Sequence, residues 1–416
     1  MPEERSSHLR RFGRWYDPGV DETDIAIVGA GSAGLATAAL LQEQGLRPLV
    51  LEAGPEPGAA WRERYDRLRL HTPRLLSGLP GLRMPRRFGR WVARDDLIEY
   101  LHAYVAAHGL DVRTGTRVTR IEPDGNGWRL DTEQGPLRAG AVVVATGYNG
   151  APFIPDWPGR ASFSGELIHS SQYRSPAPYR GKDVLVVGAG NSGAEIAHDV
   201  IDGGAARSRL SVRTPPQIVR RATLGIPAQL LGMAIRKMPP HWVDPFTIWQ
   251  RKVAIPDLTA QGLPRPPHGV RTAFLSTGTT PILDVGIVAA VKSGRVEVVA
   301  AVEGFDGADV LLADGSRIRP EVVIAATGFR AGLDGLAGHL DVLGPRGLPK
   351  KTDGEPVLPG LWFVGFTPTL GGQLREGSIA ARKVAAALAA QVGDRMQPVG
   401  RVDDEADRVP GADLAQ

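Results

Sequence analysis

Two glycine-rich turns in this sequence have the spacing of sites that bind dinucleotides. The first, Gly29-Ala30-Gly31-Ser32-Ala33-Gly34, directly follows the β-branched run 25–28, and Glu52 stands 18 residues after its last glycine. In such a turn the first glycine permits the bend, the second lets the backbone approach a pyrophosphate, and the third lets a helix pack closely on the strand. A carboxylate at that distance accepts hydrogen bonds from ribose hydroxyls. Rather than a plain glycine-rich turn, we therefore predict a dinucleotide site with contacts from Gly29, Gly31, Ser32, Ala33, Gly34 and Glu52.

The second turn differs from the first at the position that selects the cofactor. It reads Gly188-Ala189-Gly190-Asn191-Ser192-Gly193, and Arg213-Thr214 stands where the first unit has Glu52. A guanidinium can hold a 2′-phosphate through two hydrogen bonds, whereas a carboxylate repels it. The first site is thus suited to FAD and the second to NADPH, with Arg213 as a plain surface arginine the alternative. The contacts expected here are Gly188, Gly190, Asn191, Ser192, Gly193, Arg213 and Thr214.

The elements that position these turns repeat one plan. The first copy should contain strand 25–28, helix 35–44, strand 48–51 and a β-meander of strands 116–121, 128–132 and 141–145. The second should contain strand 182–187, helix 194–201, strand 210–212, a meander through 296–312 and strand 322–326. Each copy ends on the same three residues, and we add these ends and one meander residue to the cofactor contacts: Val118, Ala145, Thr146, Gly147, Ala326, Thr327 and Gly328.

This order predicts an α/β fold with two dinucleotide-binding, Rossmann-like domains. The NADPH domain is inserted into a split FAD domain, because the chain returns to the first copy after the second is complete. The expected division is 1–165 for the first part of the FAD domain, 166–325 for the NADPH domain, and 326–416 for the second part of the FAD domain with a C-terminal tail. A helix is expected at 95–108, and 1–22 reads as a tail or outer strap.

Composition narrows the function classes. The chain has 416 residues, a net charge of +4 and no cysteine. Without cysteine there is no disulfide, thiolate metal site or dithiol relay, and we expect no metal. The 49 Lys and Arg residues are spread along the chain, which disfavours nucleic-acid binding. The sequence contains no uninterrupted apolar run of about 18 residues, so we predict no integral membrane segment. No apolar run typical of a secretory signal follows the basic start, so we expect a cytoplasmic protein.

Between the two turns stands the pattern FxGxxxHxxxY, realised as Phe163, Gly165, His169 and Tyr173. With the two turns and the two Ala-Thr-Gly ends, it resembles the identifying motif of the flavin-containing monooxygenases. Tyr173 is followed by Arg174, unlike the motif end typical of Baeyer–Villiger monooxygenases. The stretch 61–71 and the Gly-Phe-Arg at 328–330 are similar to the plant YUCCA type, and the resemblance covers about 24–390.

The resemblance implies an oxidoreductase in which NADPH reduces FAD and O₂ then forms a C4a-(hydro)peroxyflavin that oxygenates a small organic substrate. The YUCCA type implies oxidative decarboxylation of an aryl 2-oxo acid such as indole-3-pyruvate. N- or S-oxygenation or Baeyer–Villiger oxidation of a small molecule is an alternative. So is an NADPH-dependent flavin reductase or oxidase without oxygen insertion, or a flavin-binding sensor without turnover.

The resemblance also suggests individual roles. His71 stands where many of these monooxygenases carry an asparagine beside the flavin, and Gln373 precedes the last helix near the flavin; we assign both as catalytic, with packing and a plain turn as the alternatives. Trp61 could cover a flat ring system, and Arg62 could meet phosphate or carbonyl oxygens. His169 is expected to link the cofactor domains by hydrogen bonds. The apolar segment 218–267 should form helices that line a substrate cavity, a dimer surface or a membrane surface, so a homodimer is a further expectation.

Overall fold

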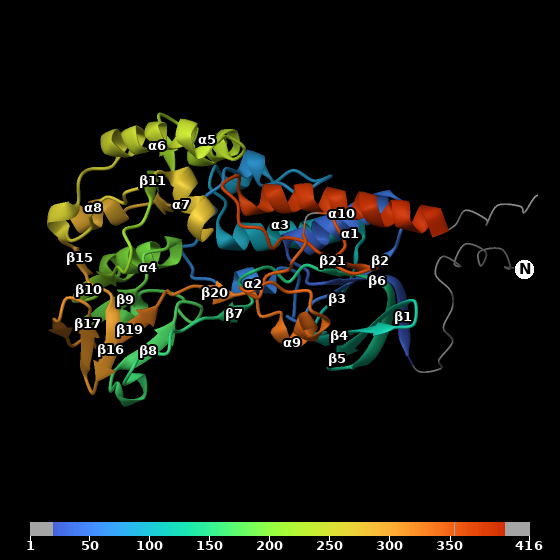
Figure 1. The fold of residues 1–416 in the computed structure, drawn as a ribbon, viewed down its shortest axis with the longest axis horizontal. Helices are drawn as coiled ribbons and strands as arrows, with labels where there is room; N and C mark the ends of the chain where they lie inside the picture. Colours follow the sequence, from blue (N-terminus) through green and yellow to red (C-terminus); the bar gives the residue numbers. More distant parts are fainter. Residues whose placement is uncertain (1–19, 353, 396–416) are drawn as a thin grey trace, which may run out of the picture.

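The structure is a computed structural model that describes residues 20–352 and 354–395, and it contains two large sheets, of which the first is mixed and the second parallel (Figure 1). The first has the strand order β3-β2-β1-β6-β5-β4, with β21 beside β6. Its strands are β1 (Asp21–Val28), β2 (Pro48–Leu51), β3 (Asp111–Arg113), β4 (Val118–Asp124), β5 (Gly127–Thr132), β6 (Gly135–Val144) and β21 (Leu361–Phe363). The sequence expected the first strand only from residue 25, but it begins at Asp21, which pairs with Leu137.

The first sheet is buried on both faces, as its β-branched strands require. On one face, α1 (Ser32–Glu43) and α3 (Arg94–His108) pack with the long helix α10 (Gln373–Arg395), and Leu35, Leu41 and Leu388 belong to this core. The α1 helix begins directly in the glycine-rich turn, three residues before the expected start. Figure 1 shows α10 lying along α1 and α3. The carboxyl ends of the strands thus meet the amino ends of α1 and α10.

The second sheet has the order β15-β10-β9-β19-β8. Its elements are β8 (Glu166–His169), β9 (Asp183–Val187), α4 (Asn191–Asp202), β10 (Arg207–Ser211), α8 (Ile287–Lys292), β15 (Val296–Val299) and β19 (Val322–Ala325). The sequence prediction of one meander over 296–312 is wrong at its start, because β15 pairs in parallel with β10 and buries Val296. The antiparallel sheet consists of β16 (Val302–Asp306), β17 (Asp309–Leu312) and β18 (Arg317–Ile318).

The NADPH domain is inserted into the split FAD domain, and the two connections between them run side by side. They pair as a two-stranded ribbon of β7 (Ala151–Pro152) and β20 (Phe329–Arg330). The second sheet begins at Glu166 and its last strand ends at Ala325. The boundaries at 165/166 and 325/326 remain our interpretation of this arrangement. The tail beyond 395 and most of the expected N-terminal strap lie outside the described residues.

The extra segment of the second copy, which we call the capping segment, lies over α4 and the second sheet, and its helix α5 reaches the beginning of α10 (Figure 1). It contains β11 (Ile218–Arg220), the hairpin β12–β13 (Ala222–Thr223, Ile226–Pro227), α5 (Ala228–Ile235), α6 (Pro240–Ala254), α7 (Val270–Thr277) and β14 (Ile282–Asp284). The helices were expected, but the parallel pairing of β11 with β14 was not. Asp244 ties α6 to α7, because its Oδ1 accepts from the backbone N–H of Arg271 at 2.9 Å. The apolar outer face of α6 exposes Trp242 and Trp249, and a homodimer or membrane role for it stays a prediction.

The remaining short elements are α2 (Ala59–Arg62), α9 (Asp334–Ala337) and the 3₁₀ turns 74–76, 86–88, 160–162, 177–179, 259–261 and 338–340. Across the described ranges, no helix is both long enough and apolar enough to cross a membrane. The cytoplasmic location expected from the sequence stays a prediction.

Candidate active site

The first glycine-rich turn is built by close backbone contacts. Gly29 has φ +110°, and a Cβ on it would lie 2.9 Å from the carbonyl oxygen of Ala145. A Cβ on Gly34 would lie 2.0 Å from the carbonyl oxygen of Gly29. A Cβ on Gly31, by contrast, would meet no described atom within 4 Å. The first and third glycines are thus required by the fold, while the second leaves an open approach to the backbone, as a pyrophosphate needs.

Glu52 lies at the end of β2 beside this turn. Its carboxylate accepts from the backbone N–H of Ala30 at 2.7 Å and from that of Gly54 at 2.8 Å. These two bonds fix the carboxylate next to the amino end of α1, where a ribose would follow a bound pyrophosphate. Ser32 and Ala33 form the first turn of α1, and Thr146 and Gly147 follow β6. The residues present therefore fit FAD.

The second turn repeats these contacts. Gly188 has φ +114° with a Cβ position 2.5 Å from the carbonyl oxygen of Ala326, the Cβ position of Gly193 is 1.9 Å from the carbonyl oxygen of Gly188, and Gly190 is open. Arg213 is exposed just past β10, and within residues 20–352 and 354–395 it has no hydrogen bond or ion pair. An unpaired guanidinium there fits the 2′-phosphate of NADPH. Thr214 is exposed beside it, and Ser192, Thr327 and Gly328 lie at the same edge of the sheet.

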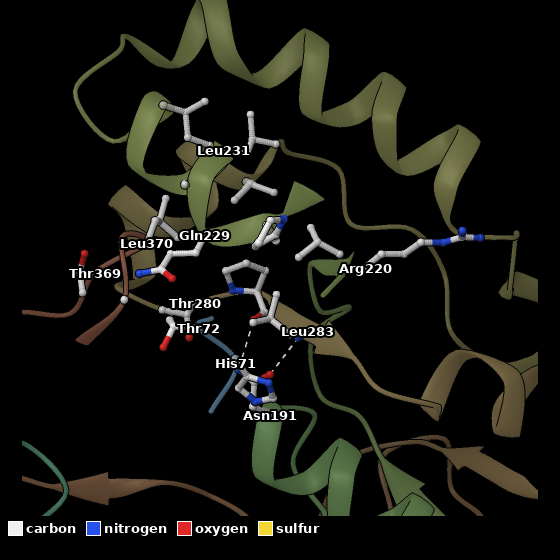
Figure 2. A pocket seen from close by; sticks show the side chains of 18 of the residues that line it. His71, Thr72, Asn191, Arg220, Gln229, Leu231, Thr280, Leu283, Thr369 and Leu370 are labelled. Carbon is white, nitrogen blue, oxygen red and sulfur yellow. Dashed lines mark hydrogen bonds between the residues drawn. The ribbon is translucent and has the colours of Figure 1, made fainter. Parts of the chain in front are cut away.

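The sequence placed Asn191 among the NADPH contacts, but its side chain makes hydrogen bonds within the protein. Its Nδ2 donates to the carbonyl oxygen of Pro281 at 3.1 Å, and its Oδ1 accepts from the N–H of Leu283 at 2.9 Å (Figure 2). The amide therefore fastens the glycine-rich turn to β14, and its backbone N–H is what remains for a phosphate. Arg62 is similarly engaged, since its Nε pairs with Glu56 at 2.8 Å on the surface. Val118 packs in the core of the first sheet.

A cavity of about 500 Å³ lies where the two cofactor units and the capping segment meet (Figure 2). The FAD side contributes Trp61, His71 and Gln373, the NADPH side contributes Asn191, and α5 and α6 supply mainly apolar walls. The structure thus brings together both predicted catalytic residues with Trp61. It does not place Arg62, His169 or Arg213 among the residues that line this cavity.

His71 meets a buried carboxylate of the other domain. Its Nε2 lies 2.9 Å from Oε1 of Glu195 on α4, whose side chain is 7% exposed. The Nδ1 of His71 is buried and has no hydrogen-bond partner among the described residues. Oε1 of Glu195 is likewise buried without a hydrogen-bond partner among the described residues, so the 2.9 Å approach is a close polar contact and not an aligned hydrogen bond. Burial, with the negative charge of Glu195, raises the pKa of Tyr65 well above its usual value, so its hydroxyl stays protonated.

Gln373 opens α10. Its Nε2 donates to the carbonyl oxygen of Gly365 at 3.1 Å, and its Oε1 is buried without a partner among the described residues. The bond to a carbonyl fixes the orientation of the amide, because only the NH₂ group can donate. Oε1 is therefore available to a donor on a bound molecule, next to the positive end of the α10 dipole.

The motif that contains His169 is a structural frame. The ring of His169 donates from Nε2 to the carbonyl oxygen of Gly328 at 2.9 Å, while Nδ1 accepts from the N–H of Ser171 at 3.1 Å. Burial lowers the pKa of His169, so the ring is held neutral. Phe163 packs on Phe305, with ring centres 5.1 Å apart. The bond joins the end of β8 to the start of the return connection, and the role of His169 as a link between the cofactor domains stays a prediction.

The sequence analysis missed two groups of polar residues near the cavity. One is a row of acids on α4, where Asp199 accepts from Arg67 at 3.0 Å and from the hydroxyl of Tyr173 at 2.6 Å, next to the Glu195–His71 pair. The other is Gln229 on α5, buried at the cavity wall. The spacing of acids on the expected helix 194–201 could have indicated the first group. Gln229 carries no local signal in the sequence.

The chain has two nucleotide-binding turns, one followed by a carboxylate and the other by a guanidinium, and the two domains that carry them share one cavity. These features define a two-cofactor oxidoreductase of the flavoprotein class. Over residues 26–220 the chain matches the family described as pyridine nucleotide-disulphide oxidoreductase, although without cysteine it has no disulphide of its own. It is 36% identical over 349 residues to indole-3-pyruvate monooxygenase YUCCA1 of Oryza sativa subsp. japonica, which covers 82% of this chain and 86% of the relative. It is 31% identical over 377 residues to probable indole-3-pyruvate monooxygenase YUCCA1 of Arabidopsis thaliana, with 89% of each chain covered.

Among solved structures, the flavin-containing monooxygenase from Stenotrophomonas maltophilia superimposes with a TM-score of 0.67 at 26% identity, over 89% of this chain and 100% of that one. The chain belongs to the flavin-containing monooxygenase family and is similar to its YUCCA members. It is an FAD- and NADPH-dependent monooxygenase that acts on small molecules with O₂. This finding favours oxygen insertion over the flavin reductase, oxidase and sensor alternatives.

Proposed function

We propose that this enzyme oxidatively decarboxylates an aryl 2-oxo acid, with indole-3-pyruvate as the preferred example. The observation that carries the proposal is the cavity at the junction of the two cofactor units, whose apolar walls and volume of about 500 Å³ suit a bicyclic aromatic ring beside a nicotinamide. The printed names of the relatives, which are indole-3-pyruvate monooxygenases, support the same substrate class.

The bound cofactors supply the redox chemistry: NADPH provides two electrons, and FAD passes them to O₂. In the overall reaction, the 2-oxo acid, NADPH, H⁺ and O₂ give the shortened carboxylic acid, CO₂, NADP⁺ and H₂O. One oxygen atom enters the new carboxylate and the other leaves as water. The carbon–carbon bond to the original carboxylate breaks.

The chain's own residues position and shelter this reaction. We assign the first glycine-rich turn and Glu52 to FAD, and the second turn and Arg213 to the phosphates of NADPH. Gln373 presents a buried acceptor, Oε1, and His71 presents a buried ring nitrogen, Nδ1, to the molecules in the cavity. The apolar walls from α5 and α6 exclude water, which protects reactive species from hydrolysis.

The substrate carboxylate needs a cation. Arg220 carries the one fixed positive charge among the described residues that line the cavity. Its Nε donates to the carbonyl oxygen of Ala254 at 2.9 Å, and Figure 2 shows its guanidinium pointing away from the cavity centre. Recognition of a carboxylate through Arg220 therefore requires the guanidinium to turn inward.

The test is a product balance with the purified holoenzyme. Indole-3-pyruvate, NADPH and O₂ should yield close to one indole-3-acetate and one CO₂ for each NADPH consumed. Stoichiometric H₂O₂ with no acid formed would contradict the proposed reaction. Rapid oxygenation of a soft amine or sulfide under the same conditions, with 2-oxo acids left intact, would instead favour the N- or S-oxygenation alternative.

A further inference from the structure

Helix α5 forms one wall of the cavity and packs against the loop before α10. A Cβ on Gly232 would lie 2.2 Å from the carbonyl oxygen of Leu370, so helix and loop are in direct backbone contact. One turn further, Arg236 forms an ion pair with Glu376. One turn earlier, Gln229 bonds the same loop. These three positions share one face of the helix, which holds Gln229 in a defined place.

The amide of Gln229 has its orientation fixed by the protein. Its Nε2 donates to the carbonyl oxygen of Gly371 at 2.6 Å, and a flipped amide would place oxygen against oxygen. The residue is 5% exposed, and its Oε1 is buried without a hydrogen-bond partner among the described residues. Figure 2 shows the carboxamide at the cavity wall beside Thr369 and Leu370. A buried carbonyl oxygen without a donor is costly, so a bound molecule is expected to supply one.

The surroundings define which donor would fit. Among the described residues that line the cavity there is no Asp or Glu, and the large apolar neighbours contributed by α5 are Leu231 and Ile235. A cationic amine there would be desolvated without a counter-charge, which is unfavourable. A neutral N–H on an aromatic ring satisfies the amide oxygen and buries its ring against the apolar walls.

We propose that Gln229 is a specificity-determining residue whose Oε1 accepts a hydrogen bond from the ring N–H of an indole-type substrate. Gln229 is distinct from His71 and Gln373, because it comes from the capping segment, whereas they come from the FAD domain. The assignment rests on the proposed substrate class. It explains how the cavity separates an indole from a phenyl or other ring that lacks N–H: such a ring leaves the amide oxygen unpaired.

The experiment measures binding, so it does not depend on turnover. Dissociation constants of indole and of indene, which has the same shape without the N–H, are determined by calorimetry on the FAD-loaded enzyme with NADP⁺. Wild type should bind indole about tenfold more tightly than indene. Gln229→Met, which keeps length and apolar volume, should bring the two constants within about twofold by weakening indole alone.

Gln250→Met is the matched control, since Gln250 lines the same cavity from α6. It should retain the wild-type ratio. Equal affinities in wild type, or an unchanged ratio in Gln229→Met, would overturn the assignment, and equal weakening of both ligands would show a structural role only. If the ratio collapses as expected but 2-oxo acids are not decarboxylated, the hydrogen-bond site stands and the proposed reaction fails.

Discussion

Helices α1 and α4 both begin in a glycine-rich turn, but they pack against different kinds of partner. Aligned on their third glycines, Ala36 and Leu40 of α1 correspond to Glu195 and Asp199 of α4. The α1 helix packs under α10 with apolar side chains on both. The α4 helix faces the segment 65–71 of the other domain through ion pairs and hydrogen bonds.

The comparison distinguishes the turns, which bind a cofactor, from the helix faces, which hold parts of the protein together. In both turns a Cβ would clash at the first and third glycines and would meet open space at the second, so both turns can receive a pyrophosphate. An apolar contact such as α1 with α10 belongs to one permanent core. The contact of α4 with 65–71 combines ion pairs with the apolar packing of Tyr65 and Leu68, and such a share of polar contacts is typical of surfaces between domains. The acids on α4 therefore mark a contact between domains, not a second catalytic centre.

Substitution of the glycines should give the largest effects. Gly34→Ala and Gly193→Ala each push a methyl group into a backbone carbonyl, and we expect a loss of at least about 3 kcal/mol in the free energy of unfolding. Gly31→Ala and Gly190→Ala meet open space, so their apoprotein unfolding midpoints should stay near wild type while affinity for FAD or NADPH falls at least about tenfold. Urea denaturation and cofactor titration measure both. Equal destabilisation by all four would contradict the division of roles.

Arg213→Ala tests the charge difference between Glu52, which follows β2, and Arg213, which follows β10. Loss of the guanidinium should raise KM for NADPH by about 10- to 100-fold and leave KM for NADH within about twofold, because NADH has no 2′-phosphate. Steady-state kinetics with both cofactors measure this. Glu52→Gln serves as the control on the other unit, since it should lower FAD retention without changing the NADPH preference. An equal loss for both nicotinamide cofactors would refute the assignment of Arg213.

The two glycine-rich turns, with the strand before each and the helix after each, could be predicted from the sequence, because they depend on local spacing. The pairing of β11 with β14 could not, since strands of three residues show no period and their partner lies across a long insertion. For the same reason Glu195 escaped notice: its role appears only when α4 meets His71 from a distant segment. The capping segment was recognised as apolar, but hydrophobic pattern alone does not say which side chains face a cavity and which face solvent.

The polar contact on α4 is tested by Asp199→Asn. The residue keeps its shape and can still accept from Tyr173, but loses its charge pair with Arg67. Because the carboxylate is largely buried, we expect the free energy of unfolding to fall by about 1–2 kcal/mol. Asp202→Asn is the matched control on the same face, with a side chain 38% exposed, and it should cost less than about 0.5 kcal/mol. Equal effects would mean that burial does not govern this contact.

The smallest effect concerns pH and the hydrogen bond from His169 to Gly328. Burial, assisted by nearby Arg64, lowers the pKa of His169 below its ordinary value of 6.5, although the bond to Gly328 opposes this. The unfolded chain therefore binds a proton more readily than the folded one. The stabilising contribution is complete above pH 6.5 and is lost as the pH falls below that value.

His169→Gln does not titrate there, so it should lose less stability than wild type between about pH 7.5 and about pH 5.5. His241→Gln, which replaces an exposed histidine on α6, is the matched control for the loss of one histidine. Denaturation midpoints measured across this range decide the matter, and a slope in His169→Gln equal to wild type would show that His169 is not the group that titrates.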